Sequence, residues 1–325
     1  MVPPAVTRAL LERELPAIQA WAGRWGWSVT IDRDSLRLEA QSSHPKDRLP
    51  VKLVGTFDGY AVIPPAWTFV NPYTGQCEGE AFPSAGEQSI FHTNLVICAP
   101  WNRLAYTIHG GPHSDWGELT GWQQDRSGST RATTIADMLS QVDVHLRRSP
   151  GRMKPVHRLR PLLTAPARGR LIVAEAVLAV TSRILSCFAG EDGDHEGIAF
   201  WLGRVVGDDT YVLAAIRPEA KHASGAVLAS ETAVGEVSRR ARGLGLGLVA
   251  QVHSHPGSDT RHSDGDDELV LMPFEGMYSL VVADYGRGAL EAAGGLGVHQ
   301  YQDGRWVAVG DTGSALVVVP PEAAL

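Results

Sequence analysis

A basic, proline-rich stretch near the middle of the chain limits how its 325 residues can fold. The segment RRSPGRMKPVHRLRPLLTAPARGR, at 147–170, carries four prolines and several arginines but no acid. Prolines at this density break helices and strands alike, because each fixes φ and lacks an N–H donor. We therefore predict a linker at 151–167 between domains at 1–150 and 168–325. Such a run is usually a solvated connector, and binding to an acidic partner is the alternative.

The overall composition is that of a soluble globular protein, with 44% hydrophobic and 20% charged residues. The net charge of −7 argues against a general nucleic-acid surface, which would be basic. No apolar run reaches the roughly 18–20 residues that span a bilayer, and prolines and acids near the start disfavour a signal peptide. The three scattered cysteines, Cys77, Cys98 and Cys187, do not form a disulfide framework. These features predict a cytoplasmic protein with neither nucleic acid nor membrane as a partner.

The first domain is predicted to be an α+β domain. Residues 5–27 show helical spacing, and Pro16 is expected to kink or split that helix; the apolar stripe is Leu11, Leu15, Ile18, Ala22 and Trp25. Short strand candidates then suggest an antiparallel meander at 28–33, 36–41, 51–57 and 61–65. After a long irregular segment, an amphipathic helix at 133–148 closes the domain, with an inward side formed by Ile135, Met138, Leu139 and Val142.

The second domain alternates helices with strands. Helices are expected from Ala174 to about residue 185 and again over 230–243, where Ser230 is the predicted N-cap. Strands are expected at 197–206, 210–218, 246–255, 277–285, 297–302 and 305–310. This alternation is typical of a sheet covered by helices.

Two histidines stand at the end of the expected strand 246–255. Residues two apart on a strand face the same side, so His253 and His255 present their imidazoles together while Ser254 faces away. The pair suits two ligands of one tetrahedral metal ion. Taken alone it is a weak signal in a chain with 12 histidines, where a surface pair is the ordinary alternative.

A third ligand is available shortly after the histidine pair. Ser263 and Asp266 have the spacing of a helix capping box, which makes a rigid support from which one carboxylate can be aimed at a metal. The neighbouring acids are expected only to stabilise the helix dipole at its N-terminus; these are Asp264, Asp267 and Glu268. His262 is a competing third ligand, less attractive because it is expected in a mobile loop.

The complete spacing His253-x-His255, seven residues, Ser263, two residues, Asp266 resembles the JAMM (MPN+/JAB) zinc isopeptidase motif without insertion or deletion. The segment HEGIAFWLG supplies the upstream glutamate of that family as Glu196, followed by Ala199 and Gly203 at the offsets where the family has small residues. The family more often has glycine at the first offset, so Ala199 departs from the pattern. Without the downstream motif, Glu196 would be an unremarkable surface acid.

The resemblance implies a cytidine-deaminase-like α/β/α mixed sheet and one Zn²⁺ per chain held by His253, His255 and Asp266. Glu196 would be the general base and Ser263 the donor to the oxyanion. The implied activity is a deubiquitinase-like isopeptidase or peptidase that cleaves after the C-terminus of a ubiquitin-like modifier, deconjugating targets or processing a precursor. The alternatives are a non-catalytic E2/MPN binding scaffold and a zinc amidase acting on a small molecule.

The first domain resembles the ubiquitin-conjugating E2 fold of divergent bacterial proteins through Pro64-Pro65, the segment HTN at 92–94, Cys98 and Trp116. That resemblance implies partners among the modifier, its conjugates and E1-like or E2-like enzymes, in a bacterial conjugation pathway with a role in antiphage defence. Catalysis by Cys98 and a purely binding domain both remain open. The segment HGGPHSDW is interpreted as a turn, with a second metal site as the alternative; its candidate ligands are His109, His113 and Asp115.

Overall fold

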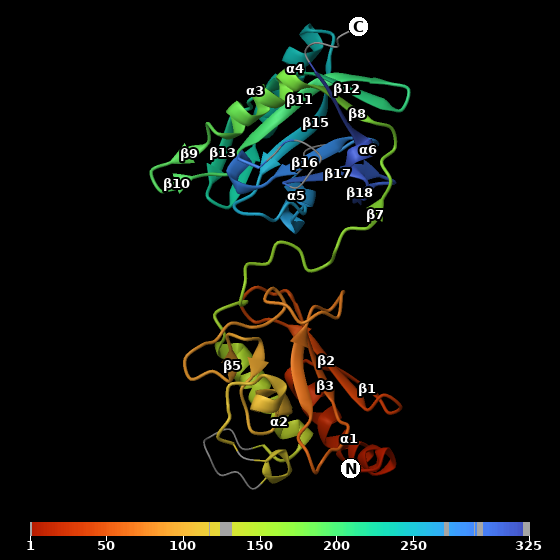
Figure 1. Ribbon diagram of the computed structural model, residues 1–325, viewed down its shortest axis with the longest axis vertical. Coiled ribbons are helices and arrows are strands. Elements are labelled where there is room, and N and C mark those ends of the chain that lie inside the picture. Colours follow the sequence, from red (N-terminus) through yellow and green to blue (C-terminus); the bar gives the residue numbers. More distant parts are fainter. Residues whose placement is uncertain are drawn as a thin grey trace. The chain divides into compact units, whose positions relative to one another are not determined.

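The computed structural model describes residues 2–116, 118–123, 132–269, 273–288, 290 and 295–320, which fall into two compact units divided after Pro161 (Figure 1). Residues 270–272, expected to continue the helix at Ser263, and the tail 321–325 of the expected second domain lie outside the described residues. Among the described helices, none combines the length and apolarity needed to cross a membrane.

The first unit packs two helices against an antiparallel sheet. Helix α1 (Pro4–Trp25) precedes the strands β1 (Ser28–Asp32), β2 (Arg37–Ser43), β3 (Pro50–Thr56) and β4 (Ala66–Val70), which pair in sequence order. Helix α2 (Ile135–Arg148) follows and buries the apolar side predicted for it. A capping box starts α2, because Thr134 accepts a hydrogen bond from the Asp137 amide and the Asp137 side chain accepts one from the Thr134 amide.

Three sequence-based expectations for this unit need correction. Helix α1 is not split at Pro16. Pro16 leaves the Glu12 carbonyl without its helical hydrogen bond, and both residues lie on the exposed side, where water can replace that bond. Trp25 is 42% exposed, and Trp21 takes the inward position instead. The expected strand at 61–65 is a turn, since Pro64 and Pro65 cannot donate to a ladder, and β4 begins just after them.

An irregular segment connects the meander to α2. It contains the short strands β5 (Phe91–His92) and β6 (Val96–Ile97) and the 3-10 turns η1 (Arg103–Ala105), η2 (Thr107–His109) and η3 (Leu119–Gly121). The buried Asn102 holds this segment to the sheet, because its amide donates to the carbonyls of Trp67 and Ile97 and its Oδ1 accepts from the Trp67 N–H.

The segment expected to be a linker is divided between the units. Arg152 is almost fully buried on the first unit, where its guanidinium pairs with Asp47 at 2.9 Å. The carbonyl of Leu159 accepts a hydrogen bond from the Asn71 amide. Further along, β7 (Thr164–Ala165) joins the sheet of the second unit.

The second unit contains a nine-stranded mixed sheet in the order β19-β8-β12-β11-β15-β16-β17-β18-β7. Its other strands are β8 (Leu171–Ala174), β11 (Ile198–Val206), β12 (Asp209–Ile216), β15 (Gly247–Ser254), β16 (Tyr278–Val282), β17 (Leu296–Gln302), β18 (Arg305–Val309) and β19 (Leu316–Val319). Smaller elements are β9 (Ala189–Gly190), β10 (Gly193–Asp194), β13 (Ala220–Ala223), β14 (Ala226–Ala229), η4 (Asp284–Gly286) and α6 (Thr312–Ala315).

Helices cover both faces of this sheet. Trp201 of β11 points toward α3 (Glu175–Leu185), where its indole N–H donates to Thr181 at 2.8 Å. Its neighbour Phe200 faces the other way and shares a core cluster with Val234 and Val237 of α4 (Glu231–Gly243). Because β11 pairs with β15 and Ile198 lies opposite His253, the histidine pair lies on the same face as Phe200. The sequence-based expectation of a mixed sheet covered by helices is therefore correct.

Candidate metal centre

The end of β15 places two imidazoles side by side. His253 and His255 are both buried, and their Nε2 atoms lie 3.3 Å apart. Ser254 points the other way, with its Oγ accepting from the Gly197 N–H at 2.9 Å. The alternation expected of a strand therefore holds through the two histidines, although His255 follows the last residue of β15.

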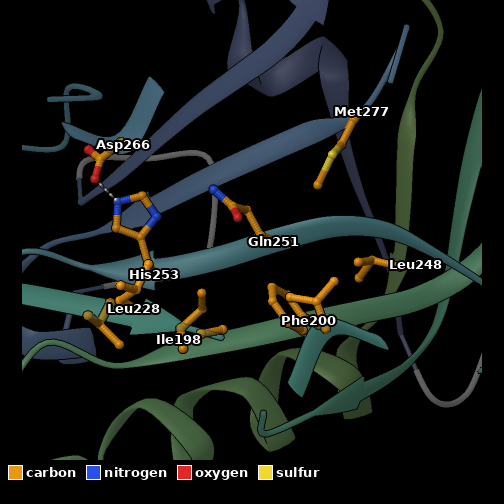
Figure 2. A pocket seen from close by; sticks show the side chains of 11 residues that line it. Ile198, Phe200, Leu228, Leu248, Gln251, His253, Asp266 and Met277 are labelled. Carbon is orange, nitrogen blue, oxygen red and sulfur yellow. Dashed lines mark ion pairs between the residues drawn. The ribbon is translucent and has the colours of Figure 1, made fainter. Parts of the chain in front are cut away.

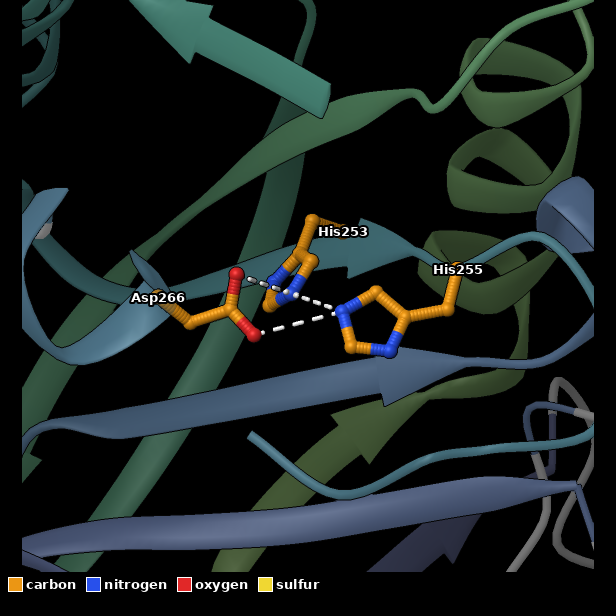
Figure 3. A group of neighbouring side chains, drawn as sticks. All are labelled: His253, His255 and Asp266. Carbon is orange, nitrogen blue, oxygen red and sulfur yellow. Dashed lines mark hydrogen bonds and ion pairs between the residues drawn. The ribbon is translucent and has the colours of Figure 1, made fainter. Parts of the chain in front are cut away.

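Asp266 approaches the imidazoles from the short helix α5 (Asp264–Leu269) (Figure 3). Its Oδ1 lies 3.3 Å from His253 Nε2, and its Oδ2 lies 3.2 Å from His255 Nε2. A reciprocal capping box orients the carboxylate: the Ser263 N–H donates to Asp266 Oδ2 at 2.6 Å, and the Asp266 N–H donates to Ser263 Oγ at 3.1 Å. The same hydrogen bonds thus begin the helix and aim the carboxylate.

The spacing of these three groups fits a tetrahedral metal ion. Ligand atoms bound to one zinc ion at its usual bond lengths lie about 3.3–3.4 Å apart. The two imidazole Nε2 atoms lie 3.3 Å apart, and Asp266 approaches each of them with a different oxygen, Oδ1 at 3.3 Å from His253 and Oδ2 at 3.2 Å from His255. One donor atom from each of the three residues lies within 4.8 Å of the other two, so the three side chains could hold one ion. His255 Nδ1 lies 3.0 Å from the Asp259 carbonyl, so Nδ1 carries the proton and Nε2 is the nitrogen that would bind a metal. Two imidazoles and a carboxylate are a donor set that zinc accepts.

Glu196 lies just before β11, next to the histidine pair. Its N–H donates to the Ala223 carbonyl of β13 at 3.0 Å, and the following residue, Gly197, is bonded to Ser254 through both of its backbone groups. Position 197 requires glycine, because a Cβ there would lie 2.8 Å from the Phe188 ring and 2.9 Å from the Leu185 carbonyl oxygen. These contacts fix Glu196 to the end of β15.

The carboxylates at this centre have opposite electrostatic environments. Burial raises the pKa of Glu196 to about 7, and the nearby His255 opposes this shift only in part. Burial would also raise the pKa of Asp266, but the adjacent imidazoles of His253 and His255 outweigh it and hold that pKa well below its ordinary value. One carboxylate is therefore anionic under all ordinary conditions, while the other can exchange a proton near neutral pH.

His262, the competing third ligand, does not join this group. It is fully buried, contrary to the expectation of a mobile loop. Its ring nitrogens lie 2.9 Å from Asp267 Oδ1 and 2.7 Å from Ser279 Oγ, and the ring stacks on His299. These contacts occupy both nitrogens and leave neither for a metal. From the sequence, Asp267 was expected only to stabilise the helix dipole, but its carboxylate also contacts the His262 ring.

The sequence does not directly predict the buried polar residues behind the candidate metal ligands. Ser279 accepts a hydrogen bond from the Gln251 amide at 3.0 Å, and both are buried beside His262 and His299. The only signal was indirect: polar residues interrupt the apolar strands at Gln251, Ser279 and His299. Buried polar groups need partners, so such interruptions indicate an internal hydrogen-bonded network.

An apolar recess adjoins the centre on the same face of the sheet (Figure 2). His253 and Asp266 form its polar end. The remainder is lined mainly by side chains of β11, β14 and β15, with Met277 and Val234; these are Ile198, Phe200, Val227, Leu228, Ala229, Leu248 and Gln251. The recess is therefore suited to an apolar group bound next to the metal ligands.

The candidate residues of the first unit form two separate contacts. His92 Nδ1 lies 2.8 Å from Asn94 Oδ1, whereas His113 Nε2 lies 2.8 Å from the Cys98 sulfur. Within the part of the chain that is described, His109, His113 and Asp115 are not gathered as metal ligands. No pattern in the sequence indicates that His113 is the partner of Cys98.

Comparison with known proteins gives one related sequence and several remote structures. No protein-family model matches the chain. A protein of Sinorhizobium fredii named "Probable metalloprotease y4jG" is 34% identical over 103 residues, which cover 30% of this chain and 62% of that protein. The match thus spans less than two thirds of the relative's length.

Three solved structures align with about half of the chain. A Desulfitobacterium hafniense protein has 13% identity and a TM-score of 0.36, covering 47% of this chain and 94% of its own. A Salinibacter ruber protein has 19% identity and a TM-score of 0.32, with coverage of 50% and 95%. A JAB1/MPN domain protein from Archaeoglobus fulgidus has 17% identity and a TM-score of 0.27, with coverage of 46% and 98%. Alignments at these TM-scores do not establish the fold or activity of this chain.

Proposed function

We propose that the second unit is a zinc-dependent metallopeptidase of the JAMM type. The observation that carries this proposal is the triangle of His253, His255 and Asp266, whose donor atoms lie close enough together to hold one metal ion beside a buried glutamate. The likeness to a protein named as a metalloprotease supports it. A binding scaffold would need neither the ligand triangle nor a buried carboxyl with a raised pKa.

The chain's own residues provide proton transfer at this centre. A bound zinc ion supplies a water whose pKa is lowered toward about 7. The Glu196 carboxylate accepts a proton at the start of the reaction and returns it to the departing amine, which avoids expulsion of an unprotonated amide nitrogen. The buried carboxyl of Glu196 lies close enough to His255 and Asp266 to interact with both electrostatically, so it stands beside the ligands where these transfers would take place.

Ser263 is proposed to stabilise the negative charge that develops on the carbonyl oxygen. Its Oγ accepts from the Asp266 N–H, and a hydroxyl can also donate a hydrogen bond. The capping box holds this hydroxyl close to the carboxylate of Asp266, so capping and catalysis use the same residue. An oxyanion donor of this kind typically contributes about 2.7–4 kcal/mol to transition-state stabilisation.

We further propose that the scissile amide follows the C-terminus of a ubiquitin-like modifier, either on a lysine or before a tail peptide. The motif resemblance supports this substrate class, and the recess next to His253 suits an apolar side chain of an extended tail. The first unit would bind the modifier or an E1-like or E2-like enzyme of the same cytoplasmic pathway, with a role in antiphage defence. The acidic balance of the chain suits a protein partner better than a nucleic acid.

The test uses the full chain loaded with zinc and a ubiquitin-like precursor that carries a C-terminal extension, read by intact mass. We expect cleavage after the terminal glycine, with no product from Glu196→Gln or from chelator-treated protein. Cleavage that persists in both controls would contradict the metallopeptidase proposal. Hydrolysis of small amides without any cleavage of the precursor would instead support the amidase alternative.

A further inference from the structure

A second pair of imidazoles meets in the second unit, outside the triangle of His253, His255 and Asp266. His195 lies between β10 and β11, and His222 lies in β13. Their Nδ1 atoms are 2.7 Å apart. This contact joins the segment that leads into β11 to the β13–β14 hairpin, two parts of the chain that are labelled in Figure 1.

A carboxylate holds the far side of the His195 ring. Asp192 Oδ1 lies 2.5 Å from His195 Nε2, and this hydrogen bond holds the pKa of Asp192 below its ordinary value. Because the ionised carboxylate only accepts, Nε2 carries a proton, and the neutral ring directs the lone pair of Nδ1 toward His222. Histidines that bind metals are oriented in the same way, by a carboxylate that accepts from the nitrogen opposite the metal.

Close packing fixes the His195 ring in this position. Its side chain is only 10% exposed, and its N–H donates to the Phe188 carbonyl at 3.2 Å. A Cβ at Gly190 of β9 would lie 2.3 Å from His195 Cε1 and 2.7 Å from Asp192 Oδ1. Glycine at position 190 therefore leaves the room that both the imidazole and its carboxylate occupy.

The His222 ring is oriented by packing but can shift. It meets the Phe188 ring edge-on, with centroids 5.1 Å apart, and the Arg217 guanidinium lies over the same phenyl ring. Two nitrogens on one tetrahedral zinc ion lie about 3.3–3.4 Å apart, so the imidazoles would have to separate slightly. His222 is half-buried and belongs to a separate two-stranded sheet, which makes it the ring that can move.

We propose that His195 and His222 bind a second divalent transition-metal ion of the kind that prefers imidazole, such as zinc, with water completing its coordination. The ion binds both Nδ1 atoms in place of the hydrogen between them. The displaced Nδ1 proton of His222 is replaced by one on its Nε2, so both rings stay neutral. The Glu196 N–H donates to the carbonyl of Ala223, next to His222, so the ion would reinforce the attachment of β13 to the start of β11.

A plain hydrogen bond between the two rings is the other use of this pair, and one substitution separates the two. In His222→Asn, the side-chain amide nitrogen stands close to the place of Nδ1 and can still donate to His195. An amide nitrogen does not bind zinc. The variant therefore keeps the hydrogen bond and loses the metal ligand.

The test dialyses the full chain to equilibrium against buffer with a fixed micromolar concentration of free zinc and measures bound zinc by elemental mass spectrometry. Zinc stays in the buffer because two imidazoles hold an ion more weakly than three ligands. We expect two equivalents in wild type and one in His222→Asn. His255→Ala should also bind one, at the second pair. His109→Asn, which changes an exposed histidine of the first unit, should still bind two.

Two further readings sharpen the result. Asp192→Asn should weaken binding of the second equivalent by about 10–100-fold, the usual cost of removing the partner of a histidine ligand. Zinc should slow hydrogen exchange of the Glu196 amide in His255→Ala, and this effect should vanish when His222→Asn is added. Without zinc, the same amide reports whether β13 keeps its place in each variant.

The outcomes for the two metal centres are distinguishable. Loss of zinc in His222→Asn but not in His255→Ala would support the second pair and contradict the first centre. Equal zinc in His222→Asn and wild type would overturn the proposal, as would a wild-type chain whose zinc is entirely lost in His255→Ala. Either result would leave His195 and His222 as a hydrogen-bonded contact only.

Discussion

The two units each bring polar side chains together, but by different means. In the second unit, the candidate metal ligands lie at the end of β15 and near the start of α5, and the two histidines are almost fully buried. In the first unit, Cys98 and His113 meet where two irregular stretches cross, and the imidazole is one third exposed. Regular elements can hold three ligand atoms at fixed spacing, whereas the loop pair leaves its thiol accessible from solvent.

The largest expected effect is a loss of precursor hydrolysis when a residue of the second unit is changed, with no loss when Cys98 of the first unit is changed. Asp266→Asn should lower precursor hydrolysis by at least about 1,000-fold, because it removes the only anionic member of the ligand triangle. Asp264→Asn, which changes an exposed acid of the same helix, should leave hydrolysis within about twofold of wild type. Cys98→Ser should likewise have no effect. Steady-state kinetics with the zinc-loaded proteins provide the measurement, and strong loss in Cys98→Ser would show that the sites are not independent.

A smaller loss of activity is expected when the capping serine of α5 is replaced, and the capping box of α2 provides the comparison. Ser263→Ala should lower kcat by about 10²–10³, because it removes a donor to the oxyanion as well as a cap. Thr134→Ala removes the corresponding cap of α2 in the first unit and should cost only about 0.5–2 kcal/mol of stability. Turnover by Thr134→Ala should match wild type at a temperature where both are folded. If the two variants lose activity equally, Ser263 acts only as a cap.

The smallest effect concerns the stability of the metal-free second unit. Glu196 has an ordinary pKa of 4.5 and a pKa of about 7 in the folded chain, so folding favours its protonated form. Stability is therefore lost as pH rises from 4.5 to 7, by about 3 kcal/mol at most. Glu196→Gln, which cannot ionise, should stabilise this unit at pH 8 and change it little at pH 4.5.

Hydrogen exchange of the β11 and β15 amides in denaturant measures this difference, and the β2 and β3 amides of the first unit are the control. We expect protection of β11 and β15 to rise in Glu196→Gln at pH 8 while the first unit is unaffected. Equal protection in the two proteins at pH 8 would mean that Glu196 is ionised without cost in the folded chain.

The parts of the structure that follow from local spacing could be predicted. A period of two residues along a strand places His253 and His255 together, and a serine three residues before an acid begins a helix at Ser263. The meander and the inward side of α2 follow from the same kind of pattern.

The features that depend on distant contacts could not be predicted. His262 looks like a loop residue in sequence, yet Ser279 and His299 bury it. Pro16 was expected to kink or split α1, but it does not split the helix, because Glu12, whose carbonyl loses its hydrogen bond, lies on the exposed side. The contact between Cys98 and His113 needs the close approach at Gly111, and a Gly-Gly pair in sequence indicates only a turn.

Metal content after dialysis tests the central claim most directly. The wild-type chain is loaded with zinc and dialysed against metal-free buffer, and its metal content is measured by elemental mass spectrometry. It should retain one equivalent of zinc per chain. His255→Ala should retain none, and His262→Ala should still retain one if folded, because both nitrogens of His262 are bonded elsewhere. A wild-type chain that retains no metal, or a His255→Ala chain that retains as much as wild type, would contradict the account.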